Sequence, residues 1–90
     1  MIRPEVYFDI NARMTERGYL LTGGSLADLS KLGLTPAEAV GMEFTFNGGN
    51  DVDNDGIPVE IIFDGTIKWS AEYGYLAITN ERGIYLKRKH

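Results

Sequence analysis

The stretch Val59–Trp69 constrains the fold of this chain more than any other. It reads V-E-I-I-F-D-G-T-I-K-W, two arms of β-branched and aromatic residues on either side of Asp64-Gly65. An Asp-Gly pair between alternating apolar residues is among the strongest short signals for a β-hairpin. Alternation gives each arm one apolar face, formed by Val59, Ile61 and Phe63 in the first arm and by Ile67 and Trp69 in the second. We therefore expect a hairpin that turns at Asp64-Gly65.

Segments outside this hairpin also alternate between apolar and polar residues, which predicts further strands. These segments are Glu5–Met14, Tyr19–Thr22, Glu43–Asn47, Tyr75–Thr79 and Ile84–Lys87. An alternative for the first is a short helix over Ala12–Arg17 with Asn11 as its N-cap. Residues 48–58 form a polar loop in this interpretation, and the last five strands form an antiparallel meander.

Two short helices are predicted between the second and third strands. Ser25–Leu32 begins with a capping serine, has Asp28 three residues on, and spaces its leucines as an apolar stripe. The second helix has Thr35 as N-cap, Pro36 in its first position and Glu38 where a capping box requires it. Gly41 ends it.

The composition fits one small α+β domain that spans residues 1–90. Hydrophobic residues make up 43% of the chain, enough for a core, and eleven glycines against three prolines suit a chain of many turns. There is no cysteine, so disulfides are excluded. We expect a small twisted antiparallel sheet or an SH3-like barrel, with one or two short helices inserted between strands 2 and 3.

The charge distribution argues against nucleic acid as a partner. The formal net charge is −4, and residues 1–80 hold twelve of the thirteen acidic side chains but only five of the nine basic ones. Binding to a phosphate backbone depends on clustered Lys and Arg. The two short helices resemble a helix-turn-helix in spacing, but the second begins with Pro36, Ala37 and Glu38 and offers no positive charge to DNA.

Membrane and enzyme classes also find little support in the sequence. No apolar run approaches the ~18 residues of a membrane span, and the first ten residues lack the apolar region of a signal peptide. We therefore expect a cytoplasmic protein. With no cysteine, and with His90 as the single histidine, the chain lacks a nucleophile–histidine arrangement, and no spacing selects a pair of carboxylates. We expect no catalytic residues.

The segment Asp51-Val-Asp53-Asn-Asp55-Gly56 matches the first half of a calcium-binding loop. Its three carboxylates are candidate metal ligands because calcium takes six to eight oxygen donors. The second half of the EF-hand pattern is missing, because Val59 and Ile62 occupy the positions of its further ligands. A hydrophilic turn explains the same residues. A calcium-dependent binding or structural module is therefore the alternative function, and no other cofactor is expected.

Three tyrosines are candidate partner-binding residues, because they fall out of phase with the apolar residues of the last strands. They are Tyr73, Tyr75 and Tyr85. Exposed tyrosines, apolar in body and polar at the tip, are typical of interaction surfaces as well as of ordinary strands. The sequence thus favours a small non-enzymatic protein-binding or regulatory module, with an acidic inhibitor as one version. Its acidic body favours a basic partner surface. An unpaired edge at Glu5–Met14 or Ile84–Lys87 would permit a homodimer.

Overall fold

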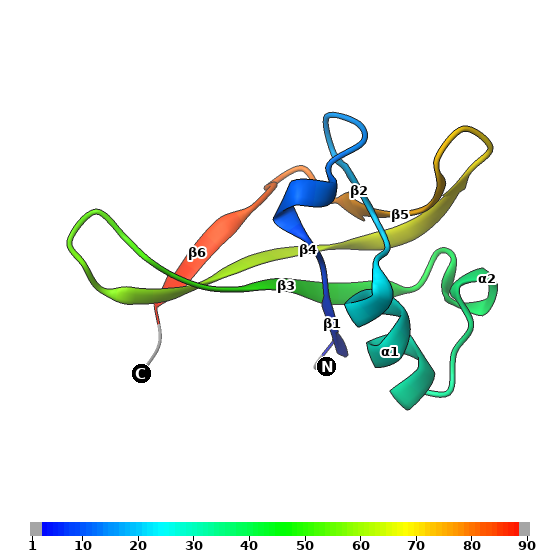
Figure 1. Ribbon diagram of the computed structural model, residues 1–90, viewed down its shortest axis with the longest axis horizontal. Coiled ribbons are helices and arrows are strands. Elements are labelled where there is room, and N and C mark those ends of the chain that lie inside the picture. Colours follow the sequence, from blue (N-terminus) through cyan, green and yellow to red (C-terminus); the bar gives the residue numbers. More distant parts are fainter. Residues whose placement is uncertain (1–2, 89–90) are drawn as a thin grey trace.

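A single long strand organises the sheet. The computed structural model describes residues 3–88, and in it β4 (Pro58–Ser70) pairs antiparallel with β3 (Glu43–Val52) along one edge. Its other edge is shared by two strands. β5 (Gly74–Thr79) pairs with residues 65–70 of β4, and β6 (Tyr85–Arg88) pairs with residues 59–62. Figure 1 shows β5 and β6 at opposite ends of β4.

Two short strands complete the sheet within residues 3–88. β1 (Glu5–Tyr7) runs parallel to β3, and β2 (Gly18–Leu20) runs antiparallel to β5. The main order is β1-β3-β4-β5-β2, with β6 beside β4. The sheet is therefore mixed, and it does not close into a barrel. The predicted α+β class is confirmed in this coarse form, whereas a wholly antiparallel sheet was wrong because β1 joins it in parallel.

Both predicted helices lie between β2 and β3, as expected. The first, α1, spans Gly23–Lys31 and begins two residues before the predicted start, with Thr22 as N-cap. Ser25 is fully buried inside its first turn, where its hydroxyl accepts a hydrogen bond from the Thr22 N–H at 3.2 Å. The second, α2, spans Pro36–Ala39 with Thr35 and Glu38 in the predicted capping box. None of the helices within residues 3–88 has the length and apolar character needed to cross a membrane.

The core lies between α1 and one face of the sheet. Four aromatic rings form its centre, with ring centroids 4.6–5.6 Å apart: Phe8, Tyr19, Phe46 and Phe63. Leu29 of α1 is fully buried against this cluster, while Leu26 and Leu32 of the predicted leucine stripe are each 44% exposed. Of the three leucines in the predicted stripe, only Leu29 anchors α1 in the core.

The predicted turn at Asp64-Gly65 is wrong, because β4 runs straight through it. Residues 59–69 are strand, as expected, but they form one strand and not two arms. Gly65 lies opposite Thr79 of β5, and a Cβ at this position would overlap the backbone carbonyl of Ile78. Gly65 is therefore required by the close approach of β5, not by a turn.

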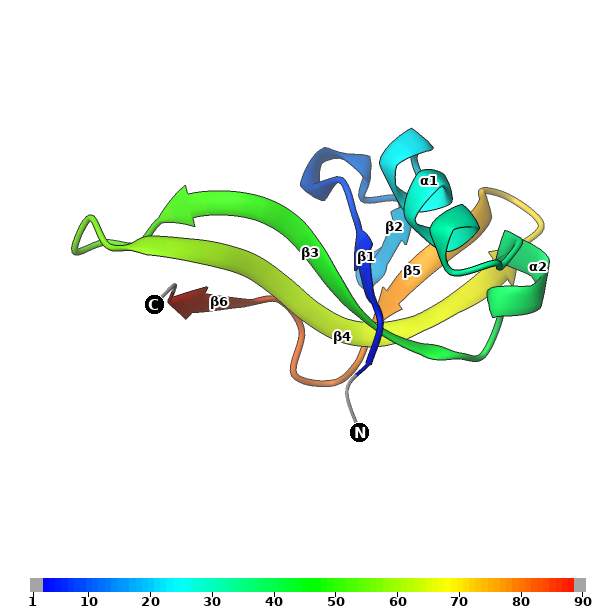
Figure 2. The same cartoon turned by 90° about the horizontal axis from the view of Figure 1, so that it is seen from below.

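The real hairpin turns at the acidic segment instead. β3 extends to Val52, past the predicted end at Asn47, with a register shift between Asn47 and Asn50. The loop that joins it to β4 is only residues 53–57. The hairpin projects as an arm away from the helices, with β6 alongside (Figure 2). The predicted meander is also wrong, because β6 returns to β4 rather than pairing with β5.

The N-terminal segment departs from both of its predictions. β1 ends at Tyr7, and residues 10–12 form a short 3-10 helix, η1 (Ile10–Ala12), with Asp9 as N-cap. Phe8 and Ala12 are buried, so the alternating apolar residues reach the core without a continuous strand. The outer edge of β1 is covered by α1, since Asp28 accepts the Tyr7 N–H at 2.9 Å. Asp28 therefore serves β1 and not a helix cap.

Candidate functional site

The acidic loop is closed by the side chain of Asp53. Its Oδ1 accepts hydrogen bonds from the N–H groups of Asp55 and Ile57, both at 2.9 Å. The Asp53 N–H donates to the Ile57 carbonyl at 2.9 Å, and Gly56 takes the positive φ of +75° that completes the turn. The Asp, Asn and Gly residues of this loop thus have a local structural role.

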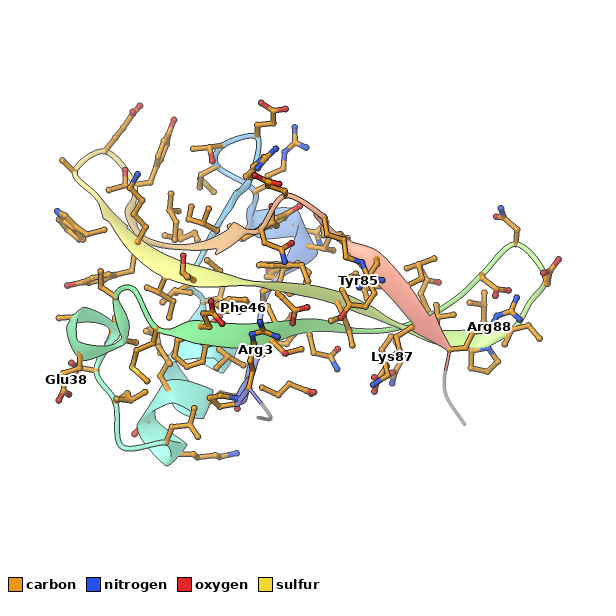
Figure 3. The ribbon with its side chains drawn as sticks, turned by 180° about the vertical axis from the view of Figure 1, so that it is seen from behind. Arg3, Glu38, Phe46, Tyr85, Lys87 and Arg88 are labelled. Carbon is orange, nitrogen blue, oxygen red and sulfur yellow. The ribbon has the colours of Figure 1, made fainter. Side chains whose placement is uncertain are left out.

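The remaining oxygens of the loop face a basic residue from β6. Arg88, which Figure 3 labels on β6, donates to Asp53 Oδ2 at 3.0 Å and to Asp55 Oδ2 at 3.4 Å. The Ile57 N–H, followed by the Asp55 N–H and Arg88, lowers the pKa of Asp53. Asp51 instead accepts its neighbour's N–H, from Val52, at 2.8 Å. Within residues 3–88 no group of three His, Cys, Asp or Glu is arranged to hold a metal ion. The calcium hypothesis stays a prediction that this geometry does not favour.

Tyr85 lies apart from the other two candidate tyrosines. It belongs to β6, where its ring packs under the Arg82 guanidinium, 3.6 Å from the ring centroid. Its hydroxyl donates to Asp64 Oδ2 over a long 3.5 Å. Burial, and then the nearby Asp64 carboxylate, raises the pKa of Tyr85. The ring of Tyr85 is therefore already engaged within the chain.

Tyr73 and Tyr75 are neighbours in sequence where β4 turns into β5. Tyr75 stands opposite Trp69 in the ladder, with ring centroids 4.8 Å apart and ring planes 57° apart. Tyr73 is in the connecting turn, and its N–H donates to the Ser70 hydroxyl at 3.2 Å. Tyr75 also packs against the edge of the core, on the helix side of the sheet. We call Trp69, Tyr73 and Tyr75 the aromatic surface.

Trp69 is the member of this surface that sequence reasoning missed. It was expected to share the apolar face of Ile67, and alternation does place both on one face. Ile67 is 1% exposed, however, whereas Trp69 is 55% exposed because it lies beyond the part of that face that the core covers. The sequence signal for its exposure was its place near the end of the strand, three residues before Glu72.

The aromatic surface has acidic character at its tip. The neighbouring Glu72 carboxylate raises the pKa of Tyr73, first as a hydrogen-bond acceptor for the hydroxyl and then through its charge. α2 reaches the same end of β4, since Val40 forms a parallel bridge with Ile67 and the Gly41 N–H donates to the Ile67 carbonyl at 3.0 Å. Val40 is 43% exposed and adds apolar area at this end. The arrangement can hold an apolar or cationic group against aromatic rings.

No protein-family model, no curated protein and no solved structure matches this chain. The functional argument therefore depends on the residues and their geometry.

Proposed function

We propose that this protein is a small non-enzymatic protein-binding or regulatory module whose partner docks on the aromatic surface. The observation that carries the proposal is that Trp69 is 55% exposed while its ring packs at a tilted angle against the ring of Tyr75. Trp and Tyr dominate the binding energy of protein interfaces because they bury large area at low cost in conformational entropy. The Trp69–Tyr75 pair is preorganised by the ladder between β4 and β5, which lowers that cost further.

A basic patch is the partner chemistry that fits best. The chain carries a net charge of −4, and Glu72 stands beside Tyr73 at the tip of the surface. Opposite charges speed the encounter of two proteins and fix their orientation. A Lys or Arg side chain of the partner would gain a cation–π contact with the exposed face of Trp69.

The proposal is tested by affinity capture from lysate followed by titration of the captured partner. Trp69→Ala should weaken binding by about 30-fold or more, because a hot-spot aromatic contributes roughly 2 kcal/mol or above. Since Trp69 is more than half exposed, this change should leave the fold intact, which a circular dichroism spectrum checks.

Leu86→Ala is the matched control. Leu86 is 54% exposed, almost the same as Trp69, but lies on β6 at the other end of β4. The Leu86→Ala variant should bind the partner with the same affinity as the unchanged protein. Equal capture by the Trp69 variant, or equal loss in both variants, would reject the aromatic surface as the docking site.

A further inference from the structure

A small depression lies on the face of the sheet opposite α1. Its volume is about 120 Å³, and its lining includes Arg3, Glu43, Asp64, Ile78, Thr79 and Asn80. It forms where the edge of β4 passes from β5 to β6. At that point no strand pairs with Asp64 on this edge, and the Asn80 N–H donates to the Asp64 carbonyl at 2.9 Å instead. Figure 3 views this face and labels Arg3 and Tyr85 on it.

The Asp64 carboxylate is half-buried in the middle of β4, yet no cationic side chain within residues 3–88 forms an ion pair with it. Oδ1 accepts the Thr45 hydroxyl at 2.9 Å, while Oδ2 has only the long 3.5 Å contact with Tyr85. A carboxylate withdrawn from water is stabilised by a cation close to it. One oxygen of Asp64 therefore has capacity for a further, charged donor.

The lining contains one cation, Arg3, and it is paired with the other carboxylate of the lining, Glu43. Its Nε donates to Glu43 Oε2 at 3.1 Å, in a pair whose side chains are 46% and 65% exposed. Exposed pairs of this kind are weak and exchange readily with solvent ions. The depression thus carries two carboxylates against one guanidinium, and the guanidinium belongs to a contact that a competing cation can open.

We propose that this depression accepts the ammonium group of a lysine side chain presented by a protein partner. A guanidinium binds carboxylates best through two parallel hydrogen bonds, and at Asp64 one of these would have to share Oδ1 with the Thr45 hydroxyl. An ammonium is a compact charge with three donors, which suits a carboxylate that keeps one weakly occupied oxygen, Oδ2. Ile78 offers apolar surface to the end of the alkyl stem.

The lysine site rests on the proposed function in one respect, namely that the lysine belongs to a protein partner. Alternation places Asp64 on the opposite face of β4 from Trp69, so the two sites do not overlap. A Trp69→Ala variant that loses its partner but still binds the lysine probe would separate failure of one site from failure of the other.

The test is a titration of ¹⁵N-labelled protein with Nα-acetyl-lysine amide, followed in amide spectra. Saturable shifts are expected at Gly65, Thr66 and Asn80. Nα,Nε-diacetyl-lysine amide, the same probe without its charge, should produce no such shifts, and Nα-acetyl-arginine amide should bind more weakly. Equal shifts with the diacetylated probe, or tighter binding of the arginine probe, would overturn the assignment.

Two substitutions in the depression should change the affinity for the lysine probe in opposite directions. Asp64→Asn keeps an acceptor for Thr45 but should abolish saturable binding, whereas Asp51→Asn, the same change in the distant loop, should leave it intact. Arg3→Gln should tighten binding by about threefold, because it removes the competing cation and frees Glu43. A misfolded variant cannot produce such a gain. Binding that ignores Asp64→Asn, falls equally in Asp51→Asn, or weakens in Arg3→Gln would refute the site.

Discussion

Two Asp-Gly pairs lie nine residues apart in this chain, and one forms a turn while the other lies within a strand. Asp55-Gly56 closes the hairpin between β3 and β4, with Gly56 at a φ of +75°. Asp64-Gly65 lies in the middle of β4 and continues the strand. In the first pair the glycine supplies a backbone angle that other residues rarely adopt. In the second it supplies empty space for the carbonyl of Ile78.

The difference shows what an Asp-Gly signal measures. Around Gly56, the carboxylate of Asp53 accepts two loop N–H groups and so stabilises the turn from within. At Gly65 the neighbouring aspartate instead faces across the sheet to Thr45 and Tyr85. A turn at residue 64 would have left the long β3 without its partner, since β3 pairs with residues 58–66 of β4. Pairing along the whole hairpin outweighed the local preference.

The largest effect should follow from Gly65→Ala. The added Cβ meets backbone of β5, which cannot move without breaking the ladder between β4 and β5. We expect a loss of about 3 kcal/mol or more in the free energy of unfolding, at the upper end of overpacking effects. Chemical denaturation measures it. A smaller loss than that of Gly56→Ala would show that β5 leaves room for a Cβ at residue 65.

Gly56→Ala should have a smaller effect. A Cβ at this position meets no atom within 4 Å, so the cost is only that of a positive φ, about 1 kcal/mol. The same denaturation experiment applies, and Gly56→Asn is its control because asparagine tolerates this conformation better than alanine. Equal losses for alanine and asparagine would argue against the left-handed turn.

Asp53→Asn should have the smallest effect at neutral pH and a clear one in acid. The pKa of Asp53 is lowered on folding, chiefly by the Ile57 N–H. A lowered folded pKa contributes stability that is present above the ordinary aspartate pKa of about 3.9 and is lost as pH falls through the folded value. The unchanged protein should therefore lose stability in this acidic range more steeply than the variant does, as thermal melts at several pH values would show.

Arg88→Gln distinguishes the two causes of that acid sensitivity. It removes the ion pair and leaves the two backbone donors of Asp53 in place. Because Arg88 is the lesser cause, most of the acid dependence should remain. If this variant flattens the pH profile as much as Asp53→Asn does, the ion pair and not the Asx turn holds the loop.

Local signals predicted the parts of the fold that depend on neighbours in sequence. The capping box of α2 formed as expected at Thr35 and Glu38, and both helices lie between β2 and β3. Strand character was also correct for β4, β5 and β6. The candidate tyrosines were located less well. Tyr75 packs against Trp69, Tyr73 stands in the adjacent turn, and Tyr85 lies apart on β6 under Arg82. The exposure of Trp69 depends on where the core ends.

The sequence by itself determined the two helices and the extended character of β4, β5 and β6, because caps and side-chain alternation act over a few residues. Only the tertiary structure decided which Asp-Gly pair turns, since that choice depends on β3, β5 and β6 competing for the edges of one strand. The same competition leaves Asp64 at the gap between β5 and β6. The depression around it arises from pairings between segments far apart in the chain, which no local pattern records.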